Sequence, residues 1–181
     1  GYSRSPSLLD LDAGRVVAAL PDPGTIGALL LPGHAGIVTS GPAGLRAWPI
    51  LGTGAGRTIG PPRLLVAQPT GHLAIGAGGK RYATTLERSG EVVVGRLDDG
   101  TVTSRFLPRR RPWTIALDES GDRVALGSWH GRVATCHDAQ GRVMFERVAR
   151  SSAFVAFSPV DGSLVVHGGD GLHLLDPATG A

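Results

Sequence analysis

Lysine, cysteine and aromatic residues are scarce in this chain of 181 residues, which has one lysine, one cysteine and 5% aromatic residues. The lone Cys136 excludes a disulfide framework or a paired-thiol metal site within one chain, and it favours a reducing compartment. Long apolar runs are also missing, since none reaches the roughly 18 uninterrupted residues of a membrane helix. Residues 1–12 lack the charged-then-apolar profile of a signal peptide. We therefore expect a cytoplasmic protein without a membrane partner.

A large excess of one charge is missing as well. The formal charge is +3, from 18 basic and 15 acidic residues, and the two signs alternate along most of the sequence. So small an excess does not favour nucleic-acid binding. Glycine and proline are abundant by contrast, with 28 and 13 residues. This composition is typical of short strands joined by tight turns and predicts an all-β chain.

One pattern recurs four times: a glycine turn, an alternating apolar strand, a second tight turn, another strand, then Asp close to Gly. The glycines that open the second strand of each copy are 43, 42 and 41 residues apart: Gly36, Gly79, Gly121 and Gly162. The glycines before the third strand are 46, 41 and 40 residues apart: Gly44, Gly90, Gly131 and Gly171. A period in this range is typical of a β-propeller, in which each repeat is one four-stranded blade.

We predict a single β-propeller region over residues 1–181, with about four four-stranded antiparallel blades. Residues 8–20 are the end of a preceding blade, and residues 27–68, 72–107 and 113–148 form complete blades. Residues 154–175 form an incomplete blade. The expected strands are 8–11, 15–20, 27–31, 37–40, 45–50, 63–68, 72–76, 81–86, 91–97, 101–107, 113–117, 123–127, 132–137, 142–148, 154–157, 164–167 and 172–175. Residues 52–62 form a long loop, and the alternation of Val92 and Val94 with Val93 predicts a half-buried strand.

Closure of the ring has two interpretations. Propellers commonly close when a strand from one terminus completes a blade begun at the other. The strand 15–20 then completes the last blade of a four-bladed ring. Alternatively, the chain is part of a larger ring, since it begins without Met and stops inside a repeat. An isolated segment of that kind exposes a sheet edge and an apolar blade face, so self-association through open edges is a further expectation.

Two stretches, LGSWHGRVATCHDAQG and GGDGLHLLDPATG, resemble the second and third strands of a WD-repeat blade. In that family a Gly-Lys-type turn precedes the second strand, as Gly79 and Lys80 do here, and a dipeptide ending in Asp closes the third strand. The matching aspartates are Asp12, Asp98, Asp138 and Asp176. The Trp of the dipeptide is replaced by Leu97, His137 and Leu175, and Asp170 matches the turn Asp of the family's Ser-His-Asp-Trp hydrogen-bonded set. The quinoprotein type of propeller is the nearest competitor.

The resemblance implies a rigid platform for protein assembly, usually without catalysis. In bacteria such arrays are often attached to signalling enzymes such as kinases or ATPases, and the arginine-rich, lysine-poor composition suits a GC-rich bacterial genome. The leading hypothesis is therefore a non-catalytic protein-interaction scaffold within a larger bacterial signalling or ATPase-associated protein. The alternative is a propeller enzyme, quinoprotein-like or a hydrolase, that uses the central funnel. Apolar inner strands favour the scaffold, through Leu73, Ile75, Ile115, Leu117, Val155 and Phe157.

The candidate partner-binding residues lie in loops that a propeller gathers on one face: Arg88, Arg109, Arg110, Arg111, Trp129, His130 and Arg150. Arginine forms forked hydrogen bonds to carboxylates and tryptophan buries a large area, so this face is predicted to bind an acidic segment of a partner protein. The opposing interpretation is a solvated arginine loop, with Trp129 only capping its blade. Trp48 is expected to pack within its blade, and so is Trp113, which opens an inner strand.

No cofactor, metal or catalytic site is predicted. The stretch GTGAG at residues 52–56 lacks the glycine of a dinucleotide fingerprint at Arg57, and the Lys-Ser/Thr pair of a Walker loop is missing. The six histidines show no metal-ligand spacing, and His167 with His173 is better explained as cross-strand neighbours. Ser128, His130 and Asp138 supply the residue types of a catalytic triad. Residues of one hairpin cannot easily aim three side chains at one point.

Overall fold

The computed structural model describes residues 5–12, 14–130 and 132–181. Within these ranges no α-helix occurs, and the helical segments are two 3₁₀ turns, η1 (Pro32–His34) and η2 (Gly54–Gly56). The predicted all-β class is confirmed. The repeat glycine Gly131, residues 1–4 of the predicted propeller region and residue 13 of the leading turn lie outside the described residues.

The strands form antiparallel sheets made of consecutive segments of the chain. A two-stranded sheet holds β1 (Ser7–Asp10) and β2 (Arg15–Ala19). The next sheet contains β3 (Gly27–Leu30), β4 (Gly36–Ser40), β5 (Leu45–Leu51), β6 (Thr58–Ile59) and β7 (Arg63–Val66). A four-stranded sheet follows with β8 (Thr70–Ile75), β9 (Arg81–Leu86), β10 (Val92–Arg96) and β11 (Val102–Phe106). Another contains β12 (Thr114–Leu117), β13 (Arg123–Gly127), β14 (Val133–Asp138) and β15 (Val143–Val148). The last has β16 (Phe154–Phe157), β17 (Leu164–Gly168) and β18 (Gly171–Leu175).

Every strand expected from the sequence overlaps one of these strands, because turn glycines and alternating apolar residues mark strand ends well. Two features differ from expectation. Part of the loop predicted over residues 52–62 is the short strand β6, whose Ile59 pairs with Ile50 of β5. Val92, Val93 and Val94 are all fully buried rather than alternating, because β10 lies in a sheet that is covered on both faces.

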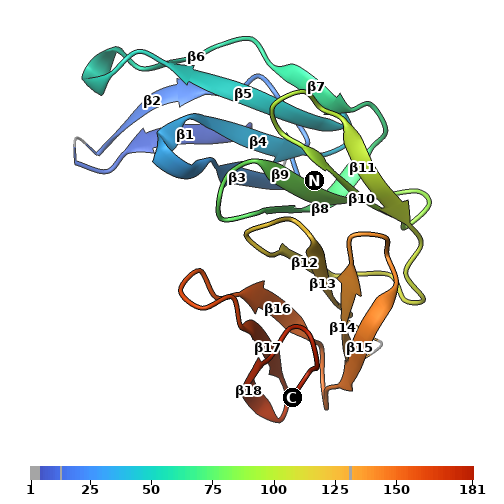
Figure 1. Cartoon of the computed structure of the whole chain (residues 1–181). Coiled ribbons are helices and arrows are strands. Elements are labelled where there is room, and N and C mark those ends of the chain that lie inside the picture. Colours follow the sequence, from blue (N-terminus) through green and yellow to red (C-terminus); the bar gives the residue numbers. More distant parts are fainter. Residues whose placement is uncertain (1–4, 13, 131) are drawn as a thin grey trace.

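The sheets stand side by side in an arc, and we call each of them a blade (Figure 1). The first strands β3, β8, β12 and β16 are successive neighbours along its inner side. At one end of the arc β2 is paired with β1 and lies near β6, while at the other end β18 is paired with β17 alone among the described residues. Figure 1 shows the two ends far apart, so β2 does not complete the last blade as four-bladed closure requires.

Apolar side chains fill the space between neighbouring blades. Tyr82, Leu86 and Val93 pack against Leu65 and Val66 of the blade before them. The opposite face of the same blade contributes to a second core with the β12–β15 blade, through Ala74, Ala83, Val92, Val94, Leu117, Val124 and Leu126. A third core joins that blade to the last one and includes Cys136, Leu164 and Val166. Since burial occurs between blades, each blade depends on its neighbours for stability.

A buried chain of hydrogen bonds connects Asp22, Thr39 and Trp48. The Trp48 indole Nε1–H donates to the Thr39 hydroxyl over 2.9 Å, and that hydroxyl donates to the Asp22 carboxylate over 2.7 Å. Arg46 forms an ion pair of 3.2 Å with the same carboxylate. Trp48 and Asp22 are each only 3% exposed, which confirms the expected packing role of Trp48.

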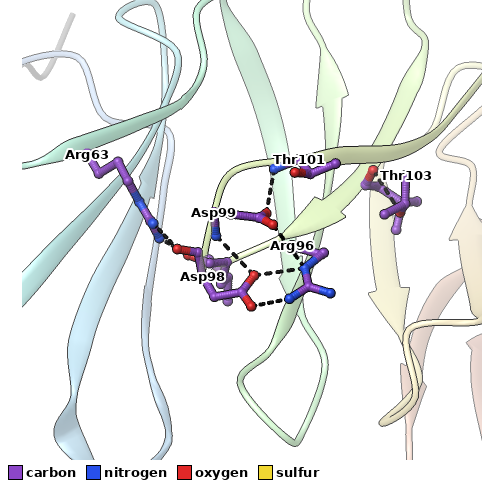
Figure 2. A network of polar contacts seen from close by, with 8 residues as sticks. Arg63, Arg96, Asp98, Asp99, Thr101 and Thr103 are labelled. Atoms are coloured by element: carbon purple, nitrogen blue, oxygen red, sulfur yellow. Dashed lines mark hydrogen bonds and ion pairs between the residues drawn. The ribbon is translucent and has the colours of Figure 1, made fainter.

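Polar contacts also tie the first complete blade to the second (Figure 2). The guanidinium of Arg63 on β7 donates to the backbone carbonyls of Leu97 and Asp98, in the turn between β10 and β11. At the end of β10, Arg96 Nε donates to the Asp98 carboxylate over 2.9 Å. Arg63 therefore holds β7, the outer strand of the first complete blade, against the β10–β11 turn of the second.

Candidate functional site

A cleft of about 980 Å³ opens on the face of the arc where loops of two neighbouring blades meet. Its walls come from the turn after β9, the connection between β11 and β12, and the turn after β13, with Gly71 and His72 of β8 between them. These are the inter-blade connections and second-turn loops that the sequence predicts on one face. The structure confirms that they gather there.

Four ring-bearing side chains follow one another along the cleft. The ring centroids of His72 and Trp113 are 5.4 Å apart, those of Trp113 and Trp129 are 4.9 Å apart, and those of Trp129 and His130 are 6.4 Å apart. We call these four residues the aromatic row. Trp113 and Trp129 are 45% and 44% exposed. Indoles are expensive to leave in water, so two exposed ones in contact are typical of a binding surface.

The position of His72 follows from an irregularity in β8. The pairing of β8 with β9 shifts register between Thr70 and Leu73, so Gly71 and His72 have no regular ladder partners. Threonine side chains satisfy the hydrogen-bonding groups of the His72 backbone instead. Its N–H donates to Thr85 Oγ1 over 2.9 Å, and its carbonyl accepts from Thr84 Oγ1 over 2.9 Å. A bulge of this kind redirects a side chain. Here the His72 ring lies against Trp113.

Arg111 is fixed at the edge of the cleft by a backbone group. Its guanidinium donates to the carbonyl oxygen of Glu87 over 2.9 Å. Burial lowers the pKa of His72 below its usual value, the positive charge of Arg111 lowers it further, and the carboxylate of Glu87 opposes both effects more weakly. His72 is therefore neutral at neutral pH. At this ring the effect of Arg111 is larger than that of Glu87.

The turn that carries Trp129 is held from both sides. Ser128 Oγ donates to the Val133 carbonyl over 3.0 Å and accepts from the Val133 N–H over 3.1 Å, which closes the turn. Ser152, in the connection to the next blade, donates its hydroxyl to the Trp129 carbonyl over 3.1 Å. The exposed indole therefore lies in a turn with hydrogen bonds at Ser128, Trp129 and Val133.

The structure brings together four of the seven predicted partner-binding residues: Arg110, Arg111, Trp129 and His130 line the cleft. Arg109 lies beside it, on a small neighbouring depression with Glu146. Arg88 and Arg150 are exposed but are not among the described residues that line the cleft. The binding role of all seven stays a prediction.

The sequence interpretation of Trp113 is wrong. It was expected in the core as the first residue of an inner strand, but β12 begins at Thr114, and Trp113 lies in the preceding connection with 45% of its surface exposed. Pro112 is buried in its place. His72 was also missed as a site residue, because nothing in the sequence marks the bulge that turns it toward Trp113. The one available signal was the Gly-His pair placed directly against a strand.

The residues considered for other chemistry are engaged elsewhere. The Ser128 hydroxyl donates to the Val133 carbonyl and accepts from the Val133 N–H. The carboxylate of Asp138 accepts a hydrogen bond of 2.6 Å from Arg142 Nε. No Ser-His-Asp relay therefore forms. The GTGAG stretch leads into β6 rather than an α-helix. His167 pairs with Leu172, while His173 pairs with Val166, so the two histidines are not direct cross-strand partners.

In residues 5–12, 14–130 and 132–181 there is no cluster of three or more His, Cys, Asp or Glu side chains with metal-binding geometry. The same ranges hold no helix long and apolar enough to cross a membrane.

No protein-family model matches this sequence, and no curated protein matches it either. Among solved structures, the chain is similar to a β-propeller in the crystal structure of a mitotic checkpoint complex, with a TM-score of 0.73 and 17% sequence identity. The fold is a β-propeller. The likeness covers 99% of this chain and 56% of the other, so this chain spans little more than half of that propeller chain's length. The cleft accordingly lies on a loop face of the propeller, between two blades.

Proposed function

We propose that this propeller is a non-catalytic protein-interaction scaffold, and that the cleft between its second and third complete blades is the docking site for an acidic segment of a partner protein. One observation carries the proposal: an exposed pair of indoles, Trp113 and Trp129, lies beside arginines without a carboxylate partner. Among the described ion pairs none involves Arg109, Arg110 or Arg111. Tryptophan and arginine are the residues that most often dominate binding energy at protein interfaces.

The wider setting is part of the same proposal. WD-repeat kinship is supported by the repeat pattern and by the Asp22–Thr39–Trp48 hydrogen bonds. A larger bacterial signalling or ATPase-associated protein in the cytoplasm is the context that the resemblance and the single reduced cysteine suggest. The enzyme alternative receives less support, because the inner-strand residues around the funnel, Leu73, Ile115 and Val155, are apolar and packed against the inter-blade cores.

The test is peptide binding with charge-matched variants. An array of about ten-residue peptides in acidic, neutral and basic versions is probed with the folded chain. We expect acidic peptides to bind, and expect the reversal of Arg109, Arg110 and Arg111 to Glu to abolish binding. Arg105→Glu, which reverses an exposed arginine on β11, is the control and keeps it. If the triple reversal leaves acidic-peptide binding unchanged, the proposed site is wrong.

A further inference from the structure

The two exposed indoles of the aromatic row are in contact and tilted against each other. Trp113 comes from the β11–β12 connection and Trp129 from the β13–β14 turn, and their planes are inclined at 55° with centroids 4.9 Å apart. His72 and His130 extend the row on either side. Two exposed indoles in contact offer an apolar surface on which a compact apolar ring can pack. The pyrrolidine ring of proline is such a group, and proline cannot itself donate a backbone hydrogen bond.

Several backbone groups around the cleft are already hydrogen-bonded to side chains. Thr84 and Thr85 occupy the carbonyl and the N–H of His72. Arg111 occupies the carbonyl of Glu87, and Ser152 occupies that of Trp129. A ligand that pairs as a β-strand competes with these side chains for the same backbone groups. A polyproline II segment needs none, because its backbone stays solvated and its extended form costs little entropy on binding.

The charge of the cleft selects the rest of the ligand. Arg110 and Arg111 line it, and the field of Arg111 at His72 outweighs that of Glu87. Aromatic rings alone also suit a quaternary ammonium or methylated lysine, through cation–π attraction. Two arginines next to the rings repel such a cation. A carboxylate near the proline, by contrast, gains forked hydrogen bonds from a guanidinium.

We propose that the cleft binds a proline-containing acidic segment of a partner protein, with one proline packed on the exposed surface of the Trp113–Trp129 pair and an Asp or Glu nearby in the segment paired with Arg110 or Arg111. The inference rests on the proposed function and names its ligand class. A single-stranded nucleic acid also combines stacking with charge. The small net charge of the chain favours the peptide.

The experiment titrates the folded chain with three synthetic peptides of about nine residues, which span roughly 28 Å as polyproline II. The first alternates glutamate with proline, the second has alanine for every proline, and the third has lysine for every glutamate. Binding is followed by calorimetry and by tryptophan fluorescence. We expect the first peptide to bind, the second to bind about tenfold more weakly, and the third not to bind.

Variants then assign the contacts. Trp129→Ala is expected to weaken binding of the first peptide about tenfold while Trp129→Phe retains most of it, and Arg110→Ala is expected to weaken it without changing the preference for proline. Both residues are exposed loop positions, so a thermal melt should match that of the parent chain. Arg105→Ala is the matched control on another surface.

The outcomes separate the two proposals. Equal binding of the first two peptides, lost with Arg110→Ala but not with Trp129→Ala, overturns the proline contact and leaves the acidic docking site in place. No binding of either acidic peptide overturns both proposals. An oligothymidine that binds through Trp129 more tightly than the first peptide overturns the peptide in favour of nucleic acid.

Discussion

The guanidinium of Arg111 donates a 2.9 Å hydrogen bond to the carbonyl oxygen of Glu87. Arg111 lies in the connection between β11 and β12, and Glu87 lies in the turn after β9 of the second complete blade. A carbonyl fixes the position of the side chain without neutralising its charge. The residue is therefore ordered and still positive, which is the state that recognition of a carboxylate requires. The neighbouring His72 reports on that charge through its pKa.

Replacement of Arg111 by methionine is expected to raise the pKa of His72. The positive charge of Arg111 lowers this pKa in the parent chain, and burial, the larger cause, remains after the substitution. The value should therefore move toward the ordinary histidine value without reaching it. An NMR titration of the His72 imidazole measures the change. Arg109→Met, which removes a neighbouring charge outside the cleft lining, should leave the pKa unchanged.

Removal of the Thr39 hydroxyl is expected to destabilise the chain. Thr39→Val leaves the Trp48 Nε1–H without its acceptor and takes one donor from the buried Asp22 carboxylate. Unsatisfied buried polar groups cost about 1–3 kcal/mol each, so we expect a loss of about 3 kcal/mol in the free energy of unfolding by urea. Thr39→Ser should restore most of it. Thr103→Val removes an exposed threonine with one 3.3 Å bond to Val94 (Figure 2) and should cost under about 0.5 kcal/mol.

Two glycine substitutions separate backbone strain from steric overlap. Gly44 and Gly162 both have positive φ, of 92° and 73°. A Cβ at Gly44 lies 2.1 Å from the carbonyl oxygen of Val66, whereas a Cβ at Gly162 meets nothing within 4 Å. Gly162→Ala should therefore cost about 1 kcal/mol from strain alone. Gly44→Ala should cost about 3 kcal/mol, because β7 must also move. Equal losses in urea unfolding contradict this explanation.

Cys136 is expected to be unreactive in the folded chain. Burial raises the pKa of its thiol to about 11, and the side chain lies in the core between the third and last blades. Because the thiolate is the reactive form, labelling by a thiol reagent at pH 8 should be slow until urea unfolds the protein. A second, exposed thiol introduced by Ser151→Cys provides the control. One equivalent should react at once and the other only in urea.

The sequence predicts strand positions in this fold better than it predicts the site. Glycines at the turns and alternating apolar residues mark each strand locally, which is why even the incomplete last blade is placed within a few residues. Burial depends on what covers a sheet. The pattern of Val92 to Val94 therefore suggests one wet face, whereas the structure packs a blade on each side.

The site depends on which loops meet, and sequence patterns do not encode this directly. Arg110, Arg111, Trp129 and His130 were found because their residue types suit recognition and propeller loops share a face. Trp113 was missed because one residue decides whether it begins the strand or precedes it. His72 was missed because its direction depends on a bulge between Thr70 and Leu73, which the hydroxyls of a neighbouring strand satisfy.

The outermost pair of strands in each complete blade has a register shift, between Leu45 and Arg46, Val94 and Gly95, and Cys136 and His137. The outer strand β15 has exposed or half-exposed residues along its whole length, so the apolar pattern does little to set its alignment. The irregularity supplies that alignment instead and increases the local twist. The residues Leu45, Val94 and Cys136 at these shifts are themselves buried between blades, so deleting one of them is expected to disturb the core as well as the alignment of the outer strand.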